Sequence, residues 1–188
     1  ISGIRTFGFR PRGASFEVAD PDKLVWSLLA TDVEFGPDGA FYVSDWTEGW
    51  ELTGRGRIYR FFDPDFRKES ADVARLLGGD ELLRANETQL VALLGHADRR
   101  IRQEAQFTLA ERGKSSAEAL QAVALNPQAS RLARLHAIWG LGQIAHKAPD
   151  VVELLVLLLS GDDWVVRGQA AKTLGDAGFQ AALPELRK

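Results

Sequence analysis

A short phrase recurs three times in the second half of the chain, and it constrains the fold more than any other feature. The phrase has the form Asp/Ser-x-x-(Ile/Ala/Val)-Arg-x-x-Ala-x-x-x-Leu, where x is any residue. It begins at Asp98, Ser130 and Asp163. The arginine recurs every 32 or 33 residues. Self-similarity at a fixed period of this size is typical of stacked repeats. Such units bury their apolar faces only against neighbours, so the phrase predicts a stacked scaffold.

The pattern from Ser70 onward indicates helices, because apolar residues return at spacings of three and four. The helices are predicted near residues 70–77, 87–95, 99–112, 115–125, 131–146, 150–160, 164–176 and from about 180. Asp98, Ser130 and Asp163 precede the second helix of each pair, where their side chains are natural N-caps. We therefore expect about three helix pairs within residues 70–188.

Residues 1–62 follow a different pattern of short alternating runs and turns. Val33 and Phe35 alternate with polar neighbours, residues 37–39 read Pro-Asp-Gly, and the alternation then resumes. Proline presets one turn dihedral and glycine accepts a positive one, so this run predicts a β-hairpin. Further strands are predicted over residues 4–10, 14–18 and 56–62. Residues 63–69 are expected to link the strand region to the helices.

Composition excludes several classes of function. The net charge of −3 offers no concentrated basic surface of the kind that nucleic-acid binding calls for. The absence of cysteine excludes disulfides, thiolate metal sites, a cysteine nucleophile and covalent c-type haem within these residues. The longest apolar run, residues 151–159, is about half a membrane span and contains Glu153, so it predicts a buried helix and no transmembrane segment. The chain has no methionine, and we expect it to be an internal piece of a longer protein.

The repeated phrase is similar to the HEAT family of helix-pair repeats, in the short form common in bacteria. The resemblance implies a polar ladder of acid and arginine side chains between successive repeats, with alanine and leucine packed in the core. The ladder residues that it implies are Asp98, Arg102, Arg134, Asp163 and Arg167. The second repeat departs from the pattern at Ser130 and Ala133, which implies a weaker contact there.

The run from Asp32 to Trp46, continuing through Trp50 to Arg60, resembles a blade of a β-propeller of the glucose/sorbosone dehydrogenase-like group. A propeller end followed by helix pairs is similar to large exported proteins of planctomycete-type bacteria, which often also carry a terminal cytochrome c domain. The resemblance implies an α+β multidomain chain. An antiparallel β-propeller blade remnant over residues 1–62 would precede an α-solenoid of HEAT-like helix pairs over residues 70–188.

The same resemblance implies a function. The segment would be a structural and protein-interaction module of a larger exported redox protein, periplasmic or on the cell surface. The alternative parent is a sugar or alcohol dehydrogenase dependent on pyrroloquinoline quinone (PQQ), which passes electrons to a cytochrome c domain outside this segment. PQQ, calcium and haem c would then belong to the parent, because a propeller forms its site from several blades. The segment alone is expected to bind no cofactor and to have no catalytic residue, and its partners to be another protein or other domains of the same chain.

Two groups of side chains are candidates for a site. The densest acidic cluster could ligate calcium or line a propeller mouth, but its spacing fits no calcium loop and favours turns, strand ends and a solvated face. It comprises Asp32, Glu34, Asp38, Asp45, Glu48 and Glu51. Asp45 remains a candidate because it ends a strand, and Trp46, Glu48 and Trp50 form a candidate interaction loop with it, although packing of these tryptophans against the repeats is favoured. Structural roles are predicted for the remaining tryptophans, as core or inter-repeat contacts, and for the histidines: Trp26, Trp139, Trp164, His96, His136 and His146.

Overall fold

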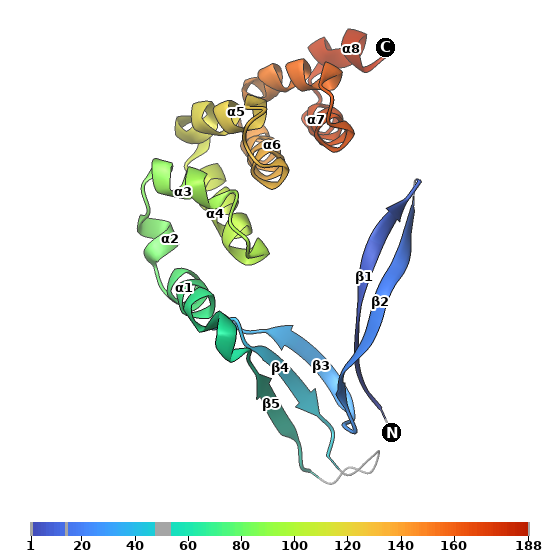
Figure 1. Cartoon of the computed structure of the whole chain (residues 1–188). Helices are drawn as coiled ribbons and strands as arrows, with labels where there is room; N and C mark the ends of the chain where they lie inside the picture. The colour runs from blue at the N-terminus through green and yellow to red at the C-terminus, as the bar shows by residue number, and fades with distance from the viewer. Residues whose placement is uncertain (1, 14, 48–53, 188) are drawn as a thin grey trace. The chain divides into compact units, whose positions relative to one another are not determined.

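A computed structural model describes residues 2–13, 15–47 and 54–187, apart from the side chains of residues 66, 67 and 70. The chain divides into two compact units, residues 1–74 and residues 75–188 (Figure 1). Helix α1 (Arg67–Leu77) contains the division. Each unit is described by itself.

The first unit begins with a two-stranded antiparallel ribbon, β1 (Gly3–Arg12) and β2 (Ser15–Trp26). The prediction of two strands is confirmed, but β2 extends eight residues past the expected end at Val18. The added part of β2 includes the sequence Asp-Pro-Asp at residues 20–22. The ladder absorbs these residues through a register shift between Thr6 and Gly8, and Asp20 takes a φ of 49°.

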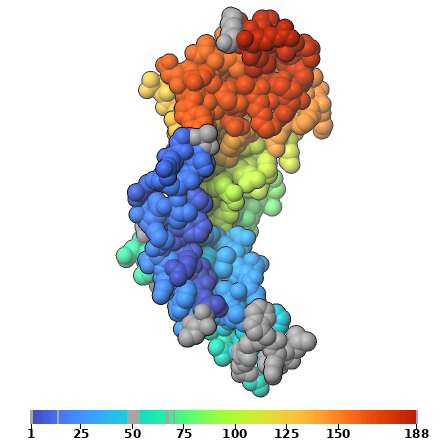
Figure 2. Space-filling view, turned by 90° about the vertical axis from the view of Figure 1, so that its right-hand side faces the viewer, coloured from blue at the N-terminus to red at the C-terminus, as the bar shows by residue number. Residues whose placement is uncertain are grey.

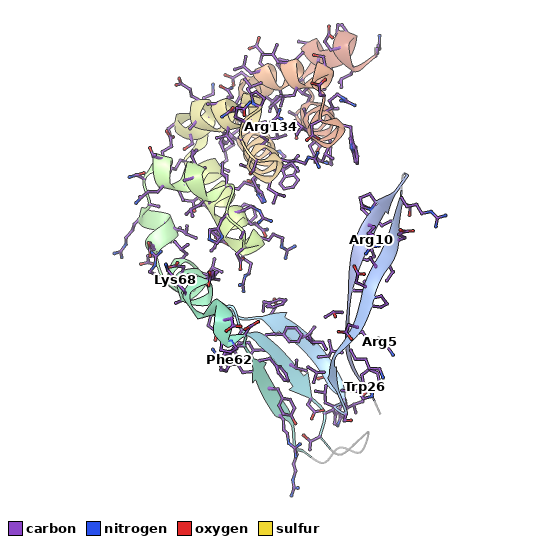
Figure 3. The ribbon with its side chains drawn as sticks, in the orientation of Figure 1. Arg5, Arg10, Trp26, Phe62, Lys68 and Arg134 are labelled. Carbon is purple, nitrogen blue, oxygen red and sulfur yellow. The ribbon has the colours of Figure 1, made fainter. Side chains whose placement is uncertain are left out.

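The ribbon, drawn in blue in Figure 2, carries the exposed aromatic side chains of Phe7, Phe9 and Phe16. Phe7 and Phe9 meet edge to face with ring centroids 5.3 Å apart, and Phe9 contacts Phe16 of the partner strand at 6.2 Å. At the other end of the ribbon, the Arg5 guanidinium lies 5.3 Å from the ring centroid of Trp26 (Figure 3). Trp26 is therefore a partly exposed partner of a cation, and the prediction of a core contact for it is wrong.

Three further strands form an antiparallel sheet in the order β3 (Ala30–Phe35), β4 (Phe41–Asp45), β5 (Arg57–Phe61). Residues paired across an antiparallel ladder share a face. One face is therefore apolar and carries Val33, Phe35, Phe41, Val43, Tyr59 and Phe61. The opposite face carries polar side chains such as Glu34, Tyr42 and Arg60. The hairpin predicted from the alternation of Val33 and Phe35 is confirmed.

The β3–β4 turn is held by Asp38, as the sequence predicted for this residue. Gly39 adopts a φ of 73°, which glycine tolerates best. The Asp38 carboxylate accepts hydrogen bonds from the Ala40 amide (3.1 Å), the Tyr42 hydroxyl (3.0 Å) and Arg60 Nε (2.9 Å). Partial desolvation opposes ionisation of Asp38, but these hydrogen bonds, that from Arg60 first, lower its pKa below the ordinary value.

Helices follow from residue 64 to the end of the described chain. They are η1 (Pro64–Phe66), α1 (Arg67–Leu77), α2 (Glu81–Arg84), α3 (Glu87–Leu93), α4 (Arg99–Glu111), η2 (Gly113–Ser116), α5 (Ala117–Leu125), α6 (Arg131–Ala145), η3 (Pro149–Ser160), α7 (Trp164–Asp176), η4 (Gln180–Ala182) and α8 (Leu183–Leu186). Residues 63–69, expected to be a linker, contain η1 and the first turn of α1. None of the helices in the described ranges combines the length and apolarity that a bilayer crossing requires.

The helix predicted over residues 150–160 is the 3₁₀ segment η3 rather than an α-helix. Val152, Leu155 and Leu158 are buried at intervals of three residues, whereas Leu154 and Leu157 are exposed at the same interval. A 3₁₀-helix has three residues per turn and so places such a row on one face. All residues from 151 to 159 except Glu153 are apolar, so the sequence does not reveal this period.

The second unit consists of helix pairs: α3 packs on α4, α5 on α6 and η3 on α7. The second helices of the pairs also contact one another, α4 with α6 and α6 with α7. The alanine and leucine of the repeated phrase are fully buried in all three repeats: Ala105, Leu109, Ala137, Leu141, Ala170 and Leu174. Within the described residues, these three pairs thus pack one after another in the order of the chain.

The buried alanines generate a stability prediction. Replacing Ala137 or Ala170 with leucine should lower the free energy of unfolding by about 1–3 kcal/mol, because the added atoms have no space between packed helices. Ala122→Leu is the matched control, since Ala122 is exposed on α5. Urea unfolding followed by far-UV circular dichroism measures the difference. Equal unfolding midpoints for all three variants would contradict the packing described above.

Candidate interaction face of the helical unit

The first residue of each repeated phrase caps the second helix of its pair, as predicted. Asp98 accepts a hydrogen bond from the Arg100 amide (2.8 Å), and Ser130 accepts one from the Ala133 amide (3.2 Å). Asp163 Oδ1 accepts from two amides at the start of α7. These bonds satisfy amide groups that have no partner within the helix. The side chain of Arg100 also binds Asp98, and this hydrogen bond is the main cause that lowers the pKa of the Asp98 carboxyl.

The arginine of each phrase binds a backbone carbonyl of its own pair, in the α3–α4 loop for Arg102 and at the end of the first helix for Arg134 and Arg167. Carbonyl groups at a helix end lack partners within the helix, so they are available as acceptors. The bonds join Arg102 Nη1 to His96 O and Ala97 O (2.7 and 2.8 Å), Arg134 Nε to Ala124 O (3.0 Å) and Arg167 Nη1 to Gly161 O (2.5 Å). Figure 3 labels Arg134 within the helical unit.

The acids of the phrase make different contacts from those that the resemblance implied. Asp98 pairs with Arg100 in its own helix at 2.8 Å. Asp163 pairs at 2.6 Å with Arg131, which precedes α7 by one repeat and lies outside the shared phrase. An acid–arginine contact between repeats is therefore present at Asp163, but it uses the first residue of α6 and not Arg134.

A chain of polar side chains, buried at Arg102, Gln106 and His136 and exposed at its end, connects α4 to α6. Arg102 Nε lies 3.2 Å from His136 Nε2, His136 Nδ1 lies 2.7 Å from Gln106 Oε1, and Gln106 Nε2 lies 3.0 Å from Gln143 Oε1. A guanidinium can only donate, so His136 accepts at Nε2 and carries its proton at Nδ1. Burial first, and then the charge of Arg102, lower the pKa of His136 to about 4.

Sequence reasoning missed this chain, although it assigned His136 a structural role. A signal was present. Gln106 follows the repeat alanine Ala105, and His136 precedes Ala137, so both polar residues occupy positions next to the core. Two polar residues on neighbouring second helices at such positions need a common partner when buried.

Two tryptophans are exposed on the second helices. Trp139 on α6 is 36% exposed and donates from Nε1 to Gln169 Oε1 on α7 (2.8 Å), which confirms an inter-repeat contact. Trp164, the first residue of α7, is 69% exposed, so the prediction of a core or inter-repeat position is wrong for it. The apolar residues next to Trp164 enter the core while Trp164 itself does not, so the sequence around it did not indicate this exposure.

Two hollows indent the face formed by α4, α6 and α7, which we call the second-helix face. One, of about 280 Å³, lies between α6 and α7 and includes Trp139, Gln143 and Gln169. The other, of about 620 Å³, lies between α4 and α6 and includes Phe107. Gln143 borders both hollows, so they adjoin along α6.

In the first unit, the candidate residues Asp45 and Trp46 are hydrogen-bonded to the backbone of Leu29. Asp45 is 8% exposed, and its Oδ1 accepts a hydrogen bond from the Leu29 amide at 2.8 Å. The Trp46 amide donates to the Leu29 carbonyl at 3.0 Å. These bonds close the end of β4 on the segment between β2 and β3. Glu48, Trp50 and Glu51 lie outside the described residues.

The other acids of the first unit do not converge on a common point. Asp32 and Glu34 each accept a hydrogen bond from the amide of the next residue, and Asp38 binds Arg60. Across residues 2–13, 15–47 and 54–187, no group of three or more acids and histidines is arranged to hold a metal ion.

Comparison with known proteins identifies repeats in the helical unit. A family profile described as HEAT repeats matches residues 124–188, which include α6, η3 and α7. No curated protein matches the chain. The helical unit therefore contains HEAT repeats, which suggest a scaffold role in protein interactions.

His136 generates a pH prediction. The unfolded histidine takes up a proton near its ordinary pKa of 6.5, while the folded one remains neutral down to about 4. The unfolded state therefore binds more protons in this window, and stability falls as the pH drops from 6.5 to 4, by up to about 1.4 kcal/mol per pH unit. His136→Gln removes the titrating group, so its unfolding free energy should fall less over pH 6.5 to 5 than that of the wild type. Parallel pH profiles of the two proteins would overturn the assignment.

Asp45 generates a second prediction. Asp45→Ala leaves the Leu29 amide without its acceptor and should cost about 1–3 kcal/mol of unfolding free energy. Asp45→Asn keeps an acceptor oxygen and should cost clearly less. Thermal unfolding of the three proteins separates these values. An asparagine variant as unstable as the alanine variant would show that the charge, and not the hydrogen bond, is what the position requires.

Proposed function

We propose that the helical unit is a protein-interaction scaffold that binds its partner on the second-helix face. The observation that carries the proposal is the exposure of Trp139 and Trp164 on neighbouring second helices. Large aromatic side chains contribute disproportionately to binding energy at protein interfaces. Most of the Trp164 side chain lies in solvent, so packing of the core does not explain a tryptophan at this position.

A glycine on α7 supports the same face. Gly168 lies in the middle of α7, four residues after Trp164 and therefore on the same side of the helix. A Cβ atom added to Gly168 would meet nothing within 4 Å. Glycine within a helix costs about 1 kcal/mol relative to alanine, and no internal contact explains it here. A partner protein that packs closely against the α7 backbone would explain a glycine at this position.

For the rest of the chain, the proposal is that residues 1–62 are the C-terminal part of a β-propeller-like domain in a larger exported redox protein. Its support is the resemblance of residues 32–60 to a propeller blade, together with the antiparallel order β3–β4–β5 and the single apolar face of that sheet. The alternative parent is a PQQ-dependent sugar or alcohol dehydrogenase, with calcium and haem c held by residues outside this segment. Intact mass and cell fractionation of the source protein test both. A cytoplasmic polypeptide of 20.7 kDa would contradict them.

Site-specific crosslinking tests the scaffold proposal. Benzoylphenylalanine in place of Trp164 should give a discrete protein adduct in an extract of the source cells. The same group in place of Glu118 on α5 or Glu153 on η3, both exposed on first helices, should give none. Equal labelling from all three positions, or none from Trp164, would contradict the assignment of the face.

Gly168 provides an independent check of the same interface. Gly168→Leu has room within the molecule and should raise the free energy of unfolding by about 0.5–1 kcal/mol through helix propensity. It should also abolish the adduct formed at residue 164, because the side chain blocks the approach of a partner. A stable variant that retains the adduct would show that the partner does not approach α7 at this point.

A further inference from the structure

Polar side chains form part of the mainly apolar wall of the hollow between α6 and α7. Trp139 and Gln143 enter it from α6, and Gln169, Lys172 and Asp176 enter it from α7; His146 also borders it. Its volume of about 280 Å³ is at the lower end of ligand pockets, which span about 300–1,000 Å³. A hollow of this size suits a short part of a longer chain better than a cofactor.

Both glutamine amides have their oxygen atoms engaged within the protein. Gln169 Oε1 accepts from Trp139 Nε1 at 2.8 Å, and Gln143 Oε1 accepts from Gln106 Nε2 at 3.0 Å. Turning either amide over would set its NH₂ group against another N–H donor. Each amide orientation is therefore fixed, and each leaves an NH₂ group that has no hydrogen-bond partner among the described residues.

The direction of donation originates at Arg102. Because Arg102 can only donate, His136 must accept from it and donate to Gln106, which fixes Gln106 to donate to Gln143. An indole N–H likewise can only donate, which fixes Gln169. Within the part of the chain that the structure describes, the two glutamines thus each keep an unbonded NH₂ donor beside the hollow, while each oxygen already accepts one hydrogen bond.

The charges in the hollow are balanced. The Lys172 ammonium pairs with the Asp176 carboxylate one helical turn away. An anionic ligand would face Asp176, and a cationic ligand would face Lys172 and the amide N–H groups. The surroundings therefore match an uncharged ligand that carries acceptor oxygens, with an apolar group to cover the Trp139 ring.

We propose that this hollow binds an extended peptide segment of a partner protein. Two backbone carbonyl oxygens of the segment accept hydrogen bonds from the NH₂ groups of Gln143 and Gln169, and an apolar side chain between them packs on Trp139. The inference rests on the proposed scaffold function and assigns it a specific subsite. Peptide carbonyls are uncharged, strong acceptors that every protein carries, so the subsite recognises extended backbone rather than one sequence.

Selection from a displayed library of short random peptides on the whole chain supplies the probes. Binding of the selected peptides is then measured by calorimetry to the wild type and to the double variant Gln143→Glu, Gln169→Glu. Glutamate keeps the oxygen that accepts from Gln106 or Trp139 but removes the NH₂ donors. We expect affinity to fall by about tenfold or more, since two hydrogen bonds to the peptide are lost and the added charges repel its carbonyl oxygens.

The matched control is Gln128→Glu, Gln180→Glu, which adds the same charge at exposed positions outside the hollow. It should bind the peptides as the wild type does. Trp139→Ala tests the apolar contact and should also weaken binding about tenfold. In NMR titrations, the side-chain amide signals of Gln143 and Gln169 should shift while those of Gln128 and Gln180 stay in place.

Two results would overturn the inference. One is a library that yields no binding peptide; the other is a set of peptides that bind the Gln143, Gln169 double variant as tightly as the wild type. In either case a specific adduct at residue 164 would still uphold the scaffold function. Peptide binding that depends on both glutamines without any adduct at residue 164 would instead uphold the subsite and reject the wider second-helix face.

Discussion

The close approach of neighbouring helices is the constraint on which the helical unit depends. Fully buried alanines lie at the same point of each repeated phrase, and they allow second helices to pack at short distances. Glycines reinforce the approach within and between pairs. A Cβ atom on Gly140 would lie 3.2 Å from Leu120 Cδ1, and one on Gly142 would lie 3.0 Å from Thr173 Cγ2. Larger residues at these positions would separate the helices and disrupt the contacts that cross between them.

Helix spacing also determines where polar groups meet. His136 reaches Arg102 and Gln106 of the preceding pair only because α4 and α6 lie side by side. Buried polar groups are tolerated when each donor finds an acceptor, and a partly satisfied set is costly. From Arg102 to Gln106 the bonds run from donor to acceptor without a charged partner for the arginine, which also donates to the carbonyls of His96 and Ala97.

Local features of the fold could be predicted from the sequence, and features that depend on neighbours could not. The caps at Asp98, Ser130 and Asp163 and the turn at Asp38 each follow from a few adjacent residues. The 3₁₀ geometry of η3 and the length of β2 do not, because an almost entirely apolar run and an Asp-Pro-Asp sequence are each compatible with more than one backbone conformation. For the candidate site, sequence reasoning proposed Asp45 and Trp46, which the structure shows bonded to Leu29. It did not find Gln143 and Gln169, since an isolated glutamine on a helix carries no signal until its partner on the next helix is known.

The hydrogen bonds of Arg102, Arg134 and Arg167 to carbonyls of their own pairs bear on how the array opens. They fasten each second helix to the end of its first helix or, for Arg102, to the loop that joins the two, so a pair has an internal clasp apart from its contacts with neighbours. In a linear array, stability is divided between the units and the interfaces that join them. With the clasp inside the unit, a helix pair is the smallest segment that can detach as a whole. Amide protons of the two helices in one pair should therefore exchange with solvent through a shared opening event, with steps in protection falling between pairs rather than between helices.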